Sequence, residues 1–401
     1  MTITLRDDAV REYGTAKGWR IFLYGAGPAL IALFLYGAFA IWSNKADSSL
    51  ALSIGLSALM VGFAGFFAYS LVVVAKWRVV VTADRIIEQN IFPFRSKEIR
   101  FEDVAGFHIN EQITVVVAQA PSKTTVKFGY TTESYGQLQQ WLADRFPDLD
   151  VESQQAEERE ILGDPTLGFN EEQRARQLEA ARQTARVLTI AGGATAAWLW
   201  WQPQPYQWAI TAGLLVPLAA MGALWLHPGL LNIDEKKGSA YPSIGIALLL
   251  PSLLLALRAL LDTELVSYGP LWRWVGAATV FFAALLALGT RSFLQRPGSR
   301  LSQAFAIALC AFAYSFGAVS TYNSTFDEAP AAAYPVKVLD KHTSSGNTTT
   351  YYLKVSPWGP FRQPEDVAVT KNYYAQSSIG ATATMLLRPG RLGIPWYTVA
   401  E

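Results

Sequence analysis

Residues 21–42, IFLYGAGPALIALFLYGAFAIW, form an apolar run without a charged residue, and residues 50–75, LALSIGLSALMVGFAGFFAYSLVVVA, form a second one after a short polar turn. A helix that crosses the hydrocarbon core of a bilayer needs about 20 apolar residues, because the core is about 30 Å thick and a helix rises 1.5 Å per residue. Both runs reach this length, so they predict a hairpin of two membrane helices. The first run lacks a small-residue cleavage site, which favours a retained anchor over a cleaved signal peptide.

Five further apolar runs follow downstream, at residues 187–201, 208–226, 244–261, 274–288 and 301–320. The first of the five is short and ends in Trp198, Trp200 and Trp201. The composition agrees with a membrane protein, since 51% of the residues are hydrophobic and 16% are charged, against about 25% charged in soluble domains. The 13 tryptophans also fit, because indole rings gather where hydrocarbon meets headgroups. The sequence therefore predicts about seven transmembrane helices.

Basic residues alternate between the loops that join these runs. The basic segments contain Arg6, Arg11, Lys17 and Arg20 before the first run, Lys236 and Lys237 after the fourth, and Arg291, Arg296 and Arg300 after the sixth. The intervening loops contain few lysines and arginines. Short loops that are rich in these residues stay in the cytoplasm. This bias predicts a cytoplasmic N-terminus, cytoplasmic residues 76–186 and an external tail from residue 322, provided that the number of spans is odd.

The pattern of polar segments predicts five regions. They are an N-terminal segment with the helical hairpin (1–75), a cytoplasmic β-rich domain (76–149), a charged helical connector (150–186), a five-helix membrane region (187–321) and a small external β-domain (322–401). Residues 77–128 alternate in short strands joined by tight turns, which is typical of an antiparallel meander. A helix follows, for which Thr131 or Thr132 is the expected cap and Leu138 and Leu142 lie on the apolar face.

Residues 77–109, WRVVVTADRIIEQNIFPFRSKEIRFEDVAGFHI, resemble the bacterial membrane-tethered PH-domain proteins when they are taken together with the preceding hairpin. Thr82, Asp84, Ile99, Asp103 and Val104 occupy positions that recur in that family. The resemblance covers residues 20–146 and implies a PH-like sheet closed by a helix, a role in binding and a place in the bacterial inner membrane. It implies no activity. The tail resembles small extracytoplasmic β-domains of uncharacterised bacterial membrane proteins.

Five basic residues in the cytoplasmic domain form a candidate binding surface. They are Arg78, Arg85, Arg95, Lys97 and Arg100, and they alternate with Glu88, Glu98, Glu102 and Asp103. A clustered set of cations would recognise a phosphorylated lipid headgroup. Mixed signs are typical of a solvated sheet surface, so protein binding or structural support is the favoured interpretation.

Arg258, near the outer end of the fifth apolar run, and Asp262, one turn later, are the candidate functional pair of the membrane region. Charge inside a bilayer is costly and often marks an ion or substrate pathway. The alternative is an arginine that reaches the interface and pairs with a carboxylate four residues on. The second interpretation is favoured, because no further buried acid or base in the sequence extends a pathway.

The tail contains alternating segments at residues 336–339, 349–355, 366–370, 382–387 and 395–399, which predict five strands. Its aromatic residues are Tyr351, Tyr352, Trp358, Phe361, Tyr373, Tyr374, Trp396 and Tyr397. They form either the core of the domain, which is the favoured interpretation, or a face that binds glycan or peptide.

Several functions lack support in the sequence. The single cysteine, Cys310, and three scattered histidines predict no disulfide, metal or cofactor. A net charge of +1 gives no argument for nucleic acid, and no catalytic motif is present, so we expect a protein that is not an enzyme. The expected function is a membrane scaffold or sensor whose partners are membrane lipids and other membrane or envelope proteins. The alternative is a transporter or channel for a small solute, formed by the third to seventh spans.

Overall fold

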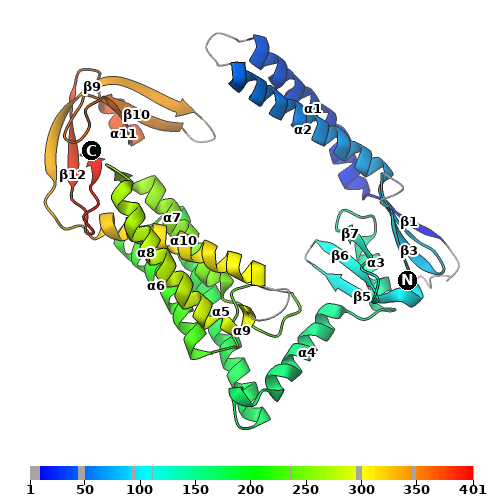
Figure 1. Ribbon diagram of the computed structural model, residues 1–401. Coiled ribbons are helices and arrows are strands. Elements are labelled where there is room, and N and C mark those ends of the chain that lie inside the picture. The colour runs from blue at the N-terminus through cyan, green and yellow to red at the C-terminus, as the bar shows by residue number, and fades with distance from the viewer. Residues whose placement is uncertain are drawn as a thin grey trace. The chain divides into compact units, whose positions relative to one another are not determined.

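The computed structural model describes residues 10–43, 50–91, 96–110, 112–234, 237–294, 300–345 and 349–400. The chain forms two compact units (Figure 1). The first comprises Met1–Glu158 with Lys237–Ala240, and the second comprises Arg159–Lys236 with Tyr241–Glu401.

The first unit begins with the predicted helical hairpin, formed by α1 (Lys17–Ser43) and α2 (Leu50–Lys76). Phe34 of α1 stacks on Phe63 and Phe67 of α2, with ring centroids 5.2 and 5.7 Å apart. The outer faces of the hairpin remain apolar, and Phe39 and Phe66 are 67% and 60% exposed. Large exposed apolar surfaces indicate contact with lipid or a partner.

Two antiparallel sheets and a helix form the β-rich domain of this unit, and β1 of the first sheet precedes the hairpin in the chain. The first sheet has the order β1-β2-β3-β4 and contains β1 (Arg11–Tyr13), β2 (Arg78–Val81), β3 (Arg85–Gln89) and β4 (Lys97–Arg100). The second contains β5 (Val104–Ile109), β6 (Ile113–Ala118) and β7 (Thr125–Gly129) in that order, and α3 (Tyr135–Ala143) packs beside it. Phe107, Phe128, Leu138 and Leu142 are almost fully buried in a shared core. The structure confirms the predicted strands and the apolar face of the helix.

The predicted cap of this helix is wrong. Ser134, and neither threonine, occupies the N-cap position, with a φ of 52° and no side-chain capping bond. The chain around the threonines instead meets the N-terminal segment. The Thr131 carbonyl accepts a 2.7 Å hydrogen bond from the Ala16 amide, and Thr132 pairs with Thr15 in a β-bridge.

The connector is helical, as predicted, and consists of α4 (Leu149–Gly163), a short 3₁₀ turn η3 (Pro165–Leu167) and the first half of α5 (Glu171–Trp201). Asn170 caps α5, because its Oδ1 atom accepts a 2.8 Å hydrogen bond from the Gln173 amide. The Gln173 side chain accepts in return from the Phe169 amide at 3.1 Å. Local capping signals in the sequence therefore fix where this helix begins.

The second unit contains a helical bundle formed by the second half of α5 and by α6 (Tyr206–Leu226), α7 (Gly245–Asp262), α8 (Gly269–Gly289) and α10 (Arg300–Thr325), with a short α9 (Arg291–Leu294). Among the described residues, six helices are long and apolar enough to cross a membrane: α1, α2, α6, α7, α8 and α10. The predicted third span lies within α5, which is not one of the six. Its N-terminal half is highly charged, and its apolar part, residues 187–201, is short.

Five strands of the tail and one strand from the α7–α8 connection form a six-stranded antiparallel sheet. Its order is β11-β10-β9-β12-β13-β8, with β8 (Glu264–Leu265), β9 (Ala332–Ser345), β10 (Thr349–Val355), β11 (Glu365–Val369), β12 (Thr382–Arg388) and β13 (Trp396–Val399), and α11 (Lys371–Gln376) follows β11. The first half of β9 pairs with β12 and its second half pairs with β10, so the sheet curls into a half-barrel. Trp358 and Tyr397 are buried in its core, which confirms the core interpretation for these two aromatic residues.

Candidate functional site

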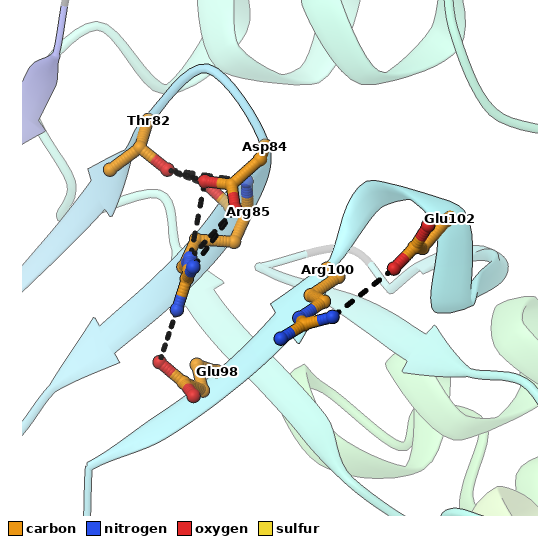
Figure 2. A network of polar contacts seen from close by, with 6 residues as sticks. All are labelled: Thr82, Asp84, Arg85, Glu98, Arg100 and Glu102. Atoms are coloured by element: carbon orange, nitrogen blue, oxygen red, sulfur yellow. Dashed lines mark hydrogen bonds and ion pairs between the residues drawn. The ribbon is translucent and has the colours of Figure 1, made fainter.

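The basic surface of the first unit consists of matched charges (Figure 2). Arg85 lies between two carboxylates, with Nη2 2.9 Å from Asp84 Oδ2 and Nη1 3.4 Å from Glu98 Oε2. The Thr82 hydroxyl donates a further hydrogen bond to Asp84 at 3.0 Å. The hydrogen bonds from Arg85 and Thr82 hold the pKa of the Asp84 carboxyl below its ordinary value. The carboxylate is therefore ionised at neutral pH and offsets the charge of the guanidinium.

The other members of the basic surface follow the same pattern. Arg100 lies 3.3 Å from Glu102, Arg78 lies 2.6 Å from Glu12, and Lys97 is opposite Glu88 in the β3–β4 register. Arg95 falls outside the described residues. Exposed pairs of this type contribute little to stability. They also leave little net positive charge for a phosphate, so the geometry favours a solvated sheet face.

Arg258 and Asp262 form the ion pair that the sequence predicts, with 3.6 Å between Nη1 and Oδ1. The guanidinium also caps α5: Nε donates to the Leu199 carbonyl at 2.6 Å, and Nη2 donates to the Trp200 carbonyl at 3.0 Å. The last carbonyls of a helix have no partner within the helix. The hydroxyl of Tyr206 donates to Asp262 at 2.9 Å. The pair therefore ties the ends of α5, α6 and α7 together.

A more extensive polar joint connects the end of α10 to the tail domain. Asn323 is fully buried, and its Nδ2 atom donates to the Ile394 carbonyl at 2.8 Å while its Oδ1 atom accepts from the Leu392 amide at 2.9 Å. The main-chain carbonyl of Asn323 accepts a third hydrogen bond, from the Arg391 amide at 2.9 Å. One asparagine thus fixes the turn between β12 and β13 to the bundle.

Asp327, one turn after Asn323, completes this joint. Its carboxylate accepts hydrogen bonds from the Gly390 amide at 2.8 Å, the Trp396 indole at 3.0 Å and the Ala329 amide at 3.0 Å. Partial burial raises the pKa of Asp327, but these hydrogen bonds and the charge of Arg388 outweigh it and hold the pKa below its ordinary value. The ionised carboxylate is therefore part of the folded joint.

A strand from the bundle also enters the tail sheet. β8 belongs to the connection between α7 and α8, and its residues Glu264 and Leu265 pair with Tyr397 and Trp396 of β13. We define the α10–tail joint as Asn323 and Asp327 with their hydrogen-bond partners, together with the β8–β13 pairing. The tail domain is thereby attached at two places, to α10 and to the α7–α8 connection.

We expect Asp327→Asn to weaken the α10–tail joint, because an amide cannot accept all three hydrogen bonds. Because the pKa of Asp327 is lower in the folded than in the unfolded chain, its ionised carboxylate stabilises the folded protein at any pH above the ordinary carboxyl pKa, about 3.9. This stabilisation is lost as the pH falls through the lowered pKa of the folded state. The measurement is thermal unfolding in detergent at pH 7 and at about pH 3. The variant should melt lower at pH 7, and the difference from the parent should shrink in acid. A difference independent of pH would contradict this role of the charge.

A large cavity, with a volume of about 1000 Å³, lies at the end of the helical bundle that is opposite to the α10–tail joint. Leu224, Leu226 and Leu288 form part of its apolar wall, and polar residues from the connector and the helix ends, including Asp164 and Arg291, form the remainder. The hydrogen bonds from Thr166 lower the pKa of Asp164. Because the cavity is lined by helix ends, it is a vestibule at one end of the bundle.

The sequence predicted the separate elements of these sites but missed the joint. Asn323 and Asp327 are polar residues that follow the last apolar run, but nothing near them in the sequence indicates their partners, which lie about 60 to 70 residues later. Among the described residues, no group of three histidine, cysteine, aspartate or glutamate side chains is arranged to hold a metal ion. Comparisons with protein-family models, with curated proteins and with solved structures find no match for the chain.

Proposed function

We propose that the chain is a non-enzymatic scaffold or sensor of the bacterial inner membrane, which couples an external β-domain to a cytoplasmic PH-like binding module. The observation that carries the proposal is the α10–tail joint. It attaches the tail to α10 through the buried Asn323 and to the α7–α8 connection through β8. A displacement of the tail, for example by an envelope protein, would reach three helices of the bundle at once.

The proposal includes α5 as a seventh span, which places the two β-rich domains on opposite faces of the membrane. The packing of α5 supports this. Gly192 lies against Ala247, near the start of α7, and the carbonyl of Leu199 binds Arg258, near its end. These two contacts lie seven residues apart on α5, so α5 runs beside α7 for about 10 Å at 1.5 Å per residue. A helix that packs in this way against an apolar span lies at the same depth in the bilayer.

The PH-like character of the cytoplasmic domain is supported by its layout. A four-stranded and a three-stranded antiparallel sheet share one core. α3 closes that core with Leu138 and Leu142, both of which are fully buried. This arrangement fits a binding module whose partners are membrane lipids or other membrane proteins.

A continuous series of contacts leads from this domain into the connector. The carboxylate of Asp150, at the start of α4, accepts a hydrogen bond from the Ile109 amide at 3.0 Å and lies 2.8 Å from Nδ1 of His108. β5 therefore holds the first turn of α4, and the chain continues through η3 into α5. This series of contacts gives the coupling a covalent and hydrogen-bonded route.

The test is a photo-crosslinking amino acid at Lys123, an exposed loop position of the cytoplasmic domain, in cells that express the parent or Asn323→Ala. If the tail controls the cytoplasmic domain, loosening the α10–tail joint changes which proteins are crosslinked at position 123. An identical set of crosslinked proteins, with the variant folded and at the same level, would count against the coupling.

The alternative function, a transporter or channel for a small solute, is favoured by one observation, the 1000 Å³ vestibule with its mixed lining. The test uses the full chain in sealed vesicles under an imposed ion gradient. Flux that falls in Arg291→Ala, a variant of a vestibule residue, would support transport. Vesicles with no flux above protein-free controls would remove the simplest form of this alternative.

A further inference from the structure

A second cavity, of about 420 Å³, lies in the first unit at the foot of the α1–α2 hairpin. Trp19 and Leu23 of α1, Val73 and Val74 of α2, and Phe128 and Tyr130 at the end of β7 belong to its lining. Its volume falls within the range of about 300–1,000 Å³ that small-molecule sites occupy. Neither the basic surface nor the α10–tail joint includes any of these residues.

Backbone hydrogen bonds hold the α1 side of the cavity, and a short covalent connection holds the α2 side. The Ala16 amide, just before α1, donates to the Thr131 carbonyl at 2.7 Å, and the Glu133 amide donates to the Gly14 carbonyl at 2.8 Å. On the other side, α2 ends at Lys76 and β2 begins two residues later. The hairpin and the β-domain thus meet through short, hydrogen-bonded connections, so the cavity exists without a ligand.

The lining of the cavity identifies its ligand as apolar. Leu23, Val73 and Val74 belong to helices that are apolar enough to cross a membrane, so the cavity continues the lipid-facing surface of the hairpin. Trp19 and Tyr130 meet edge to face, with centroids 5.7 Å apart. Such rings are typical of the level where hydrocarbon meets headgroups. An apolar group that enters here comes from the adjacent leaflet.

One cation borders this apolar lining. Lys127 of β7 is exposed and is one of the lining residues. The Glu88 carboxylate accepts a hydrogen bond from the Lys127 backbone amide at 3.1 Å. Among the described residues, no carboxylate forms an ion pair with the Lys127 ammonium group itself, whereas Arg78, Arg85 and Arg100 all have acidic partners. A lysine ammonium group at the membrane surface attracts anionic lipid.

We propose that this cavity binds one acyl chain of an anionic phospholipid, with the Lys127 ammonium group on the lipid phosphate. The chain enters from the leaflet beside α1 and α2, and its apolar carbons contact Val74 and the exposed ring of Tyr130. This binding rests on the two helices crossing the membrane and does not depend on the coupling through the tail. It also differs from headgroup capture by the basic surface of β2–β4.

The experiment places the full chain in vesicles of phosphatidylcholine and phosphatidylglycerol, with a phosphatidylglycerol probe that carries a photoreactive group in the middle of one acyl chain. Crosslinks are mapped by mass spectrometry. The expected result is labelling within residues 112–131, which include the whole β6–β7 hairpin, in addition to α1 and α2. Labelling confined to the helices would overturn the proposal, because residues 112–131 would then never meet an acyl chain.

Paired variants test the two halves of the site. Val74→Phe fills the cavity and should reduce labelling of residues 112–131 several-fold relative to α2, whereas Val72→Phe, on the exposed face of the same helix, should leave it unchanged. Lys127→Ala should reduce labelling, and Lys123→Ala, an exposed lysine outside the lining, should not. Equal labelling in Val74→Phe and Val72→Phe would contradict binding of the acyl chain in the cavity.

The identity of the headgroup is tested separately. If the corresponding phosphatidylcholine probe labels residues 112–131 as strongly, or if Lys127→Ala has no effect, the ligand is not specifically an anionic phospholipid and the proposal is overturned.

Discussion

Replacing Asn323 with alanine is expected to release the tail domain from the bundle. The change leaves the Leu392 amide and the Ile394 carbonyl without their partner in a buried site. A buried polar group that loses its hydrogen bond costs about 1–3 kcal/mol, so two such groups cost on the order of 2–6 kcal/mol. This is a large fraction of the stability of a typical domain, about 5–15 kcal/mol.

Hydrogen exchange in detergent measures this loss directly. In Asn323→Ala the Leu392 amide loses its side-chain acceptor, and the Arg391 amide keeps the main-chain carbonyl of residue 323 only while the turn stays in place. Both amides should exchange faster, while amides in the core of β5–β7 keep their rates. Tyr322→Phe is the matched control, since the Tyr322 hydroxyl makes no hydrogen bond with any described residue and its ring is 40% exposed. Unchanged exchange at Arg391 and Leu392 in Asn323→Ala would contradict the role of this residue.

The second large effect is expected at Gly192 of α5. A Cβ atom at this position would lie 2.7 Å from Cα of Ala247, and a backbone atom in α7 cannot move aside as a flexible side chain can. Small residues allow membrane helices to approach closely, and overpacking a dense contact costs about 1–3 kcal/mol. Gly192→Val should therefore separate α5 from α7 and weaken the hydrogen bonds that Arg258 donates to the end of α5.

The neighbouring glycine provides the control. A Cβ atom on Gly193 would have no heavy atom within 4 Å, while the effect of valine on helix propensity is the same at both positions. Thermal unfolding of the purified chain in detergent should give a clearly lower midpoint for Gly192→Val than for Gly193→Val. Equal midpoints would mean that α5 does not depend on its contact with α7.

Local patterns in the sequence predicted much of the fold. Alternation predicted the strands β2 to β7, and the Arg258–Asp262 pair spans one helical turn. Each of these signals is complete within a short stretch of chain, where backbone geometry decides which side chains meet. The apolar runs were equally clear for six helices, because length and composition alone identify a span.

Features that depend on distant partners were missed. β1 and β8 have three and two residues, and each exists because a distant strand, β2 or β13, supplies its hydrogen bonds. Asn323 binds a turn about 70 residues away, at Leu392 and Ile394. Arg258 has a second role, as the cap of α5, because two carbonyls nearly 60 residues earlier lie beside it. A single sequence contains no signal for such pairs.

The central claim, that the two β-rich domains lie on opposite faces of the membrane, is tested most directly by cysteine labelling. Single cysteines replace Lys123 in the β-rich domain of the first unit and Ile379, 63% exposed, in the tail. The parent chain, whose only cysteine is the buried Cys310, gives the background. A membrane-impermeant maleimide is applied to cells whose outer membrane has been opened and whose inner membrane is intact. We predict labelling at position 379 in these cells, and labelling at position 123 only after the inner membrane is also permeabilised. Labelling of both positions from the same side would mean that the chain crosses the membrane an even number of times between residues 123 and 379. This result would contradict both the span assigned to α5 and the coupling across the membrane.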